Sequence, residues 1–264
     1  MPSPTKNKRL LATESGMFGP IFVEACGTRR SMRFGSRDEV EQSRVDLARP
    51  ERPIPAYLRA AGWALSLATP PKRALLVGLG GGGFVRFLRK RYPRIEIDIV
   101  EIDPCVVGLA KSHFRIRESR KTRIHTTDAI LHLVSNRDLH DFILLDAYDG
   151  PTLSDRFAST DFFSLAAASL TAGGICAANV SLRTRREEAA TRQSFARAFP
   201  AASLEVEMPS DWNRLLVGGL KTLGRTANLR AHARSMDRDK HFPFPLAPFA
   251  RNARVLSVPK GKRT

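Results

Sequence analysis

The strongest indication of the fold is the segment Ala74-Leu75-Leu76-Val77-Gly78-Leu79-Gly80-Gly81-Gly82-Gly83-Phe84, because it joins an apolar run to a cluster of glycines. The residues before Gly78 predict a buried strand, and the apolar spacing from Phe84 to Arg91 predicts a helix. Glycines at this junction let the backbone turn tightly and approach a ligand closely, where a side chain would clash. A turn with only a structural role would need the same residues, so the loop by itself does not establish a ligand site.

Around this junction the sequence alternates between strand and helix patterns. Further strands are predicted at 95–100, 122–126, 142–145, 175–180, 203–207 and 215–219, and further helices at 56–67, 104–114, 129–134, 161–170 and 185–199. Gly173 and Gly174 are expected to stop the helix that precedes them. The alternation predicts an α/β fold, a Rossmann-like doubly wound sheet that is mostly parallel and has helices on both faces. Ligand sites of such sheets lie outside the carboxyl ends of the strands.

The segments that flank this pattern differ from it in composition. Residues 1–16 are basic and polar and are predicted to be disordered. Residues 17–50 hold short apolar runs separated by glycines, which predict an N-terminal β-strand region. The Rossmann-like domain is predicted over residues 51–224. Residues 225–264 form a basic extension, in which we expect one helix near 230–238 and irregular chain after it.

The amino-acid composition limits the kinds of partner that the chain is expected to bind. The 264 residues carry 43 Lys and Arg against 26 Asp and Glu, a formal net charge of +17. This charge is compatible with a nucleic-acid partner such as RNA, but no zinc-finger spacing or RNP-type motif supports one. The three cysteines are widely spaced, so they indicate neither a disulfide framework nor a zinc site, and no metal is expected. The sequence has no membrane-spanning run and no signal-peptide core, so a cytoplasmic location is expected.

Glycines and an acidic residue follow the first two strands at the spacing of a nucleoside site. Gly78, Gly80 and Gly82 fit the G-x-G-x-G loop of S-adenosylmethionine-dependent methyltransferases. The same loop fits the dinucleotide pattern G-x-G-x-x-G if Gly83 is its last glycine. Glu101 ends the next strand about 20 residues later, where a carboxylate can accept hydrogen bonds from both hydroxyls of a ribose.

Two further acidic residues stand where helices are predicted to begin. Asp103 precedes a proline and is suited to capping the helix that follows. Asp128 follows the third strand and could accept a hydrogen bond from the exocyclic amine of adenine, while the backbone at Ala129 holds a ring nitrogen. The same aspartate would serve as a helix N-cap, so the sequence leaves both roles open.

A pair of acidic residues follows the fourth strand. Asp146 ends that strand and Asp149 stands three residues later. Two carboxylates at this edge can hold a cationic amine and accept its proton, although Asp, Gly and Pro also make ordinary polar turns. No recognisable motif with a catalytic His, Lys or Tyr follows, which argues against a nicotinamide dehydrogenase. No GxSxG or P-loop motif is present either.

With these motifs in this order, the sequence resembles the polyamine synthase family, which comprises spermidine synthase and its spermidine-synthase-like relatives. The matching pieces are residues 74–82, 100–103, 127–129 and 142–149, with 38–43 upstream and 162–174 downstream. The resemblance implies a fold of the class I methyltransferase type with a small N-terminal β-hairpin domain, and often a homodimer. It implies transfer of an aminopropyl group from decarboxylated S-adenosylmethionine to an amine acceptor such as putrescine.

The resemblance also implies roles for single residues. Asp146 would be the catalytic carboxylate, which orients the attacking amine and takes its proton. Glu101 would bind the ribose. Other contacts to the nucleoside co-substrate would come from Gln42, Gly78, Gly80, Gly82, Asp128 and Ala129. Contacts to the small-molecule amine would come from Asp149, Tyr148 and the more loosely matched Tyr57.

Two positions depart from the family pattern. Spermidine synthases carry an Asp in the loop, as G-G-G-D-G, which pairs with the aminopropyl amine, and Gly81 takes its place here. Ala147-Tyr148 replaces the family's Ser-Ser. Ordinary S-adenosylmethionine would lose less from the missing Asp, because its tail carries a carboxylate. The alternatives are therefore an S-adenosylmethionine-dependent methyltransferase acting on a small molecule or RNA, and a non-enzymatic binding protein that keeps the fold.

Overall fold

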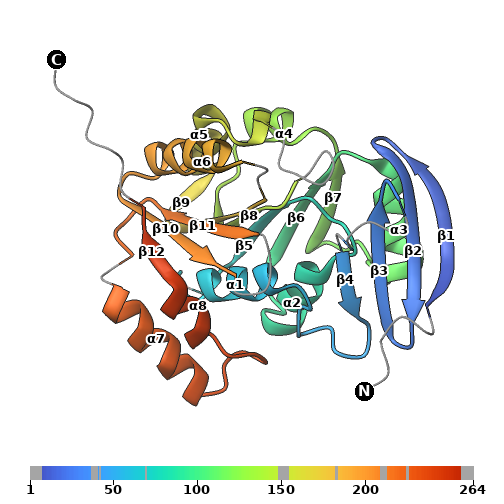
Figure 1. The fold of residues 1–264 in the computed structure, drawn as a ribbon, viewed down its shortest axis with the longest axis horizontal. Helices are drawn as coiled ribbons and strands as arrows, with labels where there is room; N and C mark the ends of the chain where they lie inside the picture. The colour runs from blue at the N-terminus through green and yellow to red at the C-terminus, as the bar shows by residue number, and fades with distance from the viewer. Residues whose placement is uncertain are drawn as a thin grey trace.

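A central sheet of eight strands runs through the computed structural model, which describes residues 8–36, 41, 43–68, 70–147, 155–181, 184–208, 213–223 and 226–256 (Figure 1). The strands are β5 (Arg73–Val77), β6 (Glu96–Glu101), β7 (Thr122–Thr126), β8 (His140–Leu145), β9 (Leu170–Val180), β10 (Ala202–Glu207), β11 (Arg214–Gly219) and β12 (Ala253–Val255). Their order is β12-β10-β11-β9-β8-β5-β6-β7. The five strands from β9 to β7 are parallel, and β11, β10 and β12 continue the sheet antiparallel.

Helices cover both faces of this sheet. One face carries α1 (Ala56–Leu65), α2 (Gly83–Arg91) and α3 (Pro104–Phe114), and the other carries α4 (Ala129–Ser135), α5 (Thr160–Ala168) and α6 (Arg185–Ala198). Side chains of β5 alternate between the two apolar cores, with Leu76 in the first and Leu75 in the second. Residues 74–77 of β5 and 142–145 of β8 are continuous apolar runs because both faces of these strands are buried there. The predicted α/β architecture is confirmed.

The N-terminal region is a second, antiparallel sheet. It holds β1 (Arg9–Gly16), β2 (Gly19–Cys26), β3 (Arg29–Phe34) and β4 (Ser43–Asp46) in sequence order (Figure 1). The prediction that residues 1–16 are disordered is wrong for 9–16, which pair with β2 from Arg9 opposite Ala25 to Gly16 opposite Gly19. The partner strand satisfies the backbone of β1, and the mixed composition of this segment, RLLATESG, does not reveal that pairing.

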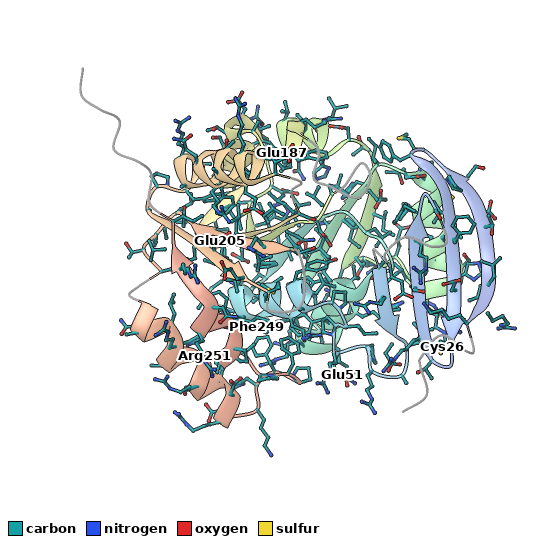
Figure 2. All side chains as sticks on the ribbon, in the orientation of Figure 1. Cys26, Glu51, Glu187, Glu205, Phe249 and Arg251 are labelled. Carbon is teal, nitrogen blue, oxygen red and sulfur yellow. The ribbon has the colours of Figure 1, made fainter. Side chains whose placement is uncertain are left out.

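The C-terminal extension is folded onto the domain. It contains α7 (Thr226–Arg238), α8 (Ala247–Asn252) and β12, which pairs antiparallel with β10. The prediction of irregular chain after 238 is therefore wrong. Phe242 and Phe244 are buried and lie 5.8 Å and 5.7 Å from the ring of Phe87 on α2, centroid to centroid. Phe249 of α8 lies inside the same layer of side chains (Figure 2). These contacts are far apart in sequence, so local patterns do not indicate them.

The boundary between α5 and β9 also differs from the prediction. The helix ends at Ala168 with Ser169 as its C-cap, and β9 begins at Leu170. Gly173 and Gly174 therefore lie inside the strand instead of stopping the helix. A Cβ at Gly174 would lie 2.9 Å from the carbonyl oxygen of His140, so the glycine allows β9 to approach β8 closely. None of the described helices is long and apolar enough to cross a bilayer.

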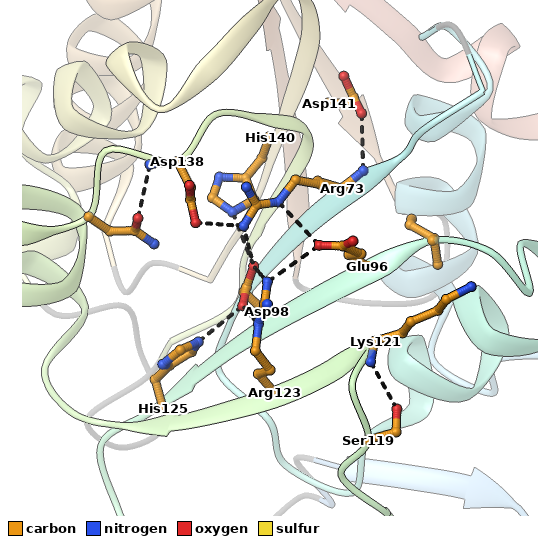
Figure 3. Close-up of polar contacts among 12 residues, drawn as sticks. Arg73, Glu96, Asp98, Ser119, Lys121, Arg123, His125, Asp138, His140 and Asp141 are labelled. Carbon is orange, nitrogen blue, oxygen red and sulfur yellow. Dashed lines mark hydrogen bonds and ion pairs between the residues drawn. The ribbon is translucent and has the colours of Figure 1, made fainter.

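A buried ion network ties the parallel strands together beneath α4. Asp98 of β6 accepts hydrogen bonds from Arg73 of β5 at 3.2 Å, from Arg123 of β7 at 2.8 Å and from His125 at 3.1 Å (Figure 3). His140 of β8 lies 3.6 Å from the same carboxylate. Burial alone would raise the pKa of Asp98, but the neighbouring His140 and the hydrogen bonds from Arg123 and His125 outweigh it and hold that pKa well below its usual range.

Candidate active site

The glycine loop leaves the carboxyl end of β5 and leads into α2. Gly78, Gly80 and Gly82 have φ angles of +98°, +48° and +66°, a left-handed backbone that residues with side chains rarely adopt. A Cβ at Gly78 would lie 2.2 Å from the carbonyl oxygen of Asp146, and a Cβ at Gly82 would lie 2.2 Å from Cδ1 of Ile116. The loop is thus packed directly against the end of β8, so the predicted loop and the predicted catalytic carboxylate are neighbours.

Glu101 lies on the other side of the loop, at the carboxyl end of β6. Its Oε2 accepts a hydrogen bond from the backbone N–H of Leu79 at 3.0 Å, and its Oε1 accepts one from the N–H of Asp103 at 3.1 Å. Burial raises the pKa of Glu101, and these backbone donors only partly oppose that effect. A carboxylate has about four acceptor positions, so lone pairs remain for the hydroxyls of a ribose.

Asp128 is the N-cap of α4 in this structure. Its Oδ1 accepts hydrogen bonds from the N–H groups of Ile130 at 2.8 Å and Leu131 at 3.1 Å. Its Oδ2 pairs with the guanidinium of Arg156 at 2.5 Å. Of the two roles that the sequence left open, the structure shows the helix N-cap. Ala129 is buried as the first residue of the helix. A bound adenine amine would have to share this carboxylate with Arg156 or replace it.

Asp146 follows β8 and is held from two sides. The hydroxyl of Tyr57 on α1 donates to its Oδ2 at 2.9 Å, and Nδ2 of Asn179 on β9 donates to its Oδ1 at 2.8 Å. Burial raises the pKa of Asp146 to about 6; these two donors lower it and the nearby charge of Glu101 raises it. A carboxyl with this pKa is ionised at neutral pH, yet it binds a proton more tightly than an exposed aspartate does.

A largely apolar pocket flanks Asp146 on the side of α5. Its free space is about 10 Å³, room for about one water molecule. Its lining residues are Leu145, Ala147, Phe157, Phe162, Phe163, Ala178 and Asn179. Hydrocarbon side chains therefore pack closely next to the polar end of β8.

The N-terminal sheet meets the glycine loop at Gly81. Ser43 of β4 accepts a hydrogen bond on Oγ from the backbone N–H of Gly81 at 2.8 Å. A Cβ at Gly81 would lie 2.7 Å from two ring atoms of Phe114 and 2.9 Å from the Ser43 Oγ. The space beside Gly81 is therefore filled by this chain's own atoms, and a side chain at that position would displace them.

The structure brings most of the predicted site residues together. The loop glycines, Glu101, Asp128 and Asp146 stand at the carboxyl ends of β5, β6, β7 and β8, and Tyr57 reaches Asp146 from α1. Gln42, Tyr148 and Asp149 lie outside the described residues.

Sequence analysis missed two asparagines of the site. Asn179 contacts Asp146, and Asn213, just before β11, donates from Nδ2 to Asn179 Oδ1 at 2.9 Å. Asn179 is one residue before the end of β9, and that end was predicted correctly at 180, so the strand-end rule could have found it. Asn213 belongs to an antiparallel extension of the sheet, for which the rule gives no guidance.

Nothing in the described part of the chain resembles a metal centre, because no three His, Cys, Asp or Glu side chains there are arranged to hold an ion. The glycine loop, the position of Glu101 at the end of β6 and the sheet order define an α/β protein with the methyltransferase-like fold. Residues 60–206, more than half of the chain, match the spermine/spermidine synthase domain. The chain belongs to the spermine/spermidine synthase family.

Individual relatives agree with this assignment. The polyamine aminopropyltransferase of Vibrio vulnificus is 30% identical over 185 residues, which cover 68% of this chain and 61% of that protein. The chain thus spans about three fifths of that relative. A probable spermidine synthase from Corynebacterium glutamicum has the same fold, with a TM-score of 0.72 at 17% identity over 93% of this chain and 90% of that one. The structure of human methyltransferase-like protein 13 in complex with SAH has a TM-score of 0.64 to this chain at 24% identity. The match covers 71% of this chain and 93% of that one.

Proposed function

We propose that the chain is a polyamine-type aminopropyltransferase, which moves an aminopropyl group from decarboxylated S-adenosylmethionine to an amine such as putrescine. The observation that carries the proposal is Asp146, a carboxylate with a pKa raised to about 6 at the carboxyl end of β8. Its two hydrogen-bond donors, Tyr57 and Asn179, are neutral, and no ion pair joins it to a cation among the residues that the structure describes. It therefore remains available to a cationic or attacking amine.

The reaction needs alignment and a proton acceptor more than any other group. The amine nitrogen attacks the carbon next to the sulfonium, the carbon–sulfur bond breaks, and its electrons stay on sulfur as a neutral thioether. The new ammonium releases one proton, which Asp146 takes up. Positioning the two reactants can supply most of the rate increase, and a placed carboxylate adds about 10²–10⁴-fold.

The nucleoside part of the co-substrate would lie along the glycine loop. Glu101 would accept hydrogen bonds from the ribose with the lone pairs that Leu79 and Asp103 leave free. Asp128 would hold the adenine amine once Arg156 shares or releases its oxygen. Contacts from Gln42, Tyr148 and Asp149 are proposed from the family resemblance.

Calorimetric titration of the purified protein with S-adenosylmethionine and with its decarboxylated form tests the co-substrate. The aminopropyl proposal expects tighter binding of the decarboxylated form, followed by turnover with putrescine. Preference for ordinary S-adenosylmethionine would instead contradict the aminopropyl reaction and direct the search to methyl acceptors. The comparison is needed because Gly81 supplies no carboxylate for the aminopropyl amine.

The Asp146→Asn variant tests the proposed base. We expect turnover to fall by at least about 100-fold, since the amide cannot take the proton. Binding of the nucleoside should persist, because Glu101 and the loop remain unchanged. The exposed Asp161, in the first turn of α5, offers a matched control, and Asp161→Asn should leave turnover as it is. Equal turnover in wild type and Asp146→Asn would remove the basis of the proposal.

A further inference from the structure

Three side chains at the ends of three strands form a hydrogen-bonded line that ends at Asp146. Asn213, just before β11, donates from Nδ2 to Oδ1 of Asn179 on β9 at 2.9 Å. Asn179 in turn donates from Nδ2 to Oδ1 of Asp146 at 2.8 Å. Asn179 is only 2% exposed, so its amide has little access to water that could replace either bond.

We propose that Asn213 is a positioning residue, which sets the amide of Asn179 so that its NH₂ group, and not its carbonyl oxygen, faces the Asp146 carboxylate. The role of that carboxylate as a base rests on the proposed function. The positioning itself does not, because it concerns only the geometry of these three residues.

The physical reason lies in the two ends of an asparagine amide. They have nearly the same size, but one end donates two hydrogen bonds and the other only accepts them. A flipped Asn179 would place its carbonyl oxygen against an ionised carboxylate, where two acceptors repel each other. The NH₂ group of Asn213 opposes that flip, because it needs the oxygen of Asn179 as its acceptor.

The register of the sheet makes Asn213 suitable for this task. Asn179 stands opposite Leu215 in the antiparallel pair of β9 and β11. Asn213 is two residues before Leu215, so it lies on the same face as Asn179, at the diagonal position where side chains still reach each other. Backbone pairing therefore holds the two asparagines in contact.

The arrangement has a measurable consequence for the proton affinity of Asp146. Asn179 and Tyr57 lower the pKa of Asp146, whereas burial and the charge of Glu101 raise it. Among the described residues these are the groups that act on the carboxyl from β9, α1 and β6. If Asn179 loses its fixed orientation, one of the two donors is weakened, and the carboxyl must hold its proton to a higher pH.

The test measures the titration of the Asp146 carboxyl by NMR on the full chain with ¹³C-labelled aspartate, the signal being assigned with Asp146→Asn. The variants are Asn213→Leu, which keeps the volume, and Asn213→Ser as a smaller replacement if the first does not fold. We expect Asn213→Leu to raise the proton affinity of Asp146 at least about threefold. Asn252→Leu, which removes an asparagine donor on α8, is the control and should leave the titration unchanged.

A double-mutant cycle shows whether Asn213 acts through Asn179. In an Asn179→Leu background, Asn213→Leu should produce no additional shift, because the amide to be oriented is gone. An unchanged titration in both Asn213 variants, or an equal shift with and without Asn179, would overturn the proposal.

Kinetics separate the positioning from the proposed function. In an active enzyme, the acid limb of the kcat profile should move with the NMR titration, while KM for the nucleoside stays constant. A wild-type protein with no turnover but with the NMR shift would refute the aminopropyl reaction and leave the positioning intact. Turnover by the wild-type protein, without any shift of the Asp146 titration in the Asn213 variants, would refute the positioning and leave the aminopropyl reaction intact.

Discussion

Asp146 shows how one residue acquires a chemical property from its surroundings. The carboxyl is crowded at the end of β8, and its partners are the neutral groups of Tyr57 and Asn179. Burial dominates and raises its pKa from 3.8 to about 6. By contrast, Asp98 is paired with two arginines, and its pKa is lowered. Two aspartates of one sheet thus differ because one faces neutral donors and the other faces cations.

The raised pKa of Asp146 predicts the pH dependence of turnover. Below about pH 6 the carboxyl becomes protonated and cannot take a proton from the amine, so kcat should fall towards tenfold per pH unit there. The contribution of Asp146 to stability changes with pH in the opposite direction. The folded protein binds this proton more tightly than the unfolded chain does, so protonation of Asp146 stabilises the fold at low pH, and this stabilisation is lost as pH rises through about 6. A kcat profile that is flat from pH 7 to 5 would contradict the assignment.

Gly81 allows a second prediction for a single residue, which concerns the stability of the fold. Gly81→Asp would restore the carboxylate of the family pattern, but its Cβ would lie 2.7 Å from the ring of Phe114. We expect the substitution to destabilise the protein by about 1–3 kcal/mol through overpacking, measured by urea unfolding. Gly108→Asp on α3, where nothing lies within 4 Å of an added Cβ, is the matched control and should cost less. Equal unfolding midpoints for the two variants would show that the ring of Phe114 moves aside freely.

The site residues that the sequence could predict are those at the ends of parallel strands. Glu101 and Asp146 were found because an apolar run followed directly by a carboxylate is a strong local signal. The partners of Asp146 could not be found with the same certainty. Tyr57 comes from a helix 89 residues earlier, and Asn179 is oriented by Asn213, which precedes an antiparallel strand, so only the packed fold brings these residues together.

At the level of elements, the Asp98 network joins four neighbouring strands. β5, β6, β7 and β8 each contribute a charged or titratable side chain to it, as Figure 3 shows for Arg73, Asp98, Arg123 and His140. The same strands present the loop glycines, Glu101, the Asp128 turn and Asp146 at their carboxyl ends. The network therefore supports the strands that carry the candidate site without contributing to its chemistry.

Asp98→Asn should reveal how much this network stabilises the fold. The amide would leave Arg73 and Arg123 without their buried anion, and we expect a loss of about 3 kcal/mol in the free energy of unfolding. That value is the lower end for a broken buried pair, because both arginines keep some contact with water. The measurement is urea unfolding at pH 7, where the carboxylate is ionised. Asp239→Asn, at an exposed position, should change stability by less than about 0.5 kcal/mol. A similar small change for Asp98→Asn would mean that the network is energetically neutral.

Helices with a strong apolar periodicity and a local start signal were predicted well. The helix at 104–114 was predicted with its observed bounds, because Pro104 and the N-cap Asp103 mark its start locally. Strand β1 lacks such a signal. Its residues mix apolar and polar types without alternation, all of them exposed or half-buried, and only pairing with β2 makes them a strand.

For the whole molecule, the C-terminal extension completes the core of the domain. Phe244 is 4% exposed and lies over Gly62 of α1 and Phe87 of α2. Phe244→Ala should therefore destabilise the whole domain by about 3–5 kcal/mol in a single cooperative transition, as followed by thermal unfolding. Phe18→Ala, at a position 45% exposed, is the control and should have little effect. If the extension of this variant unfolded at a lower temperature while the rest of the domain kept its unfolding midpoint, the extension would be an independent unit.

The addition of β12 as the outermost strand has a consequence for protein synthesis. Ribosomes deliver the chain from its N-terminus, so the edge of β10 and the apolar surface of α1 stay uncovered until the residues around 242–255 have emerged. An open strand edge beside exposed aromatic contacts is the kind of surface on which nascent chains associate wrongly. The emergence of residues 242–255 therefore determines when this surface of the newborn protein is covered.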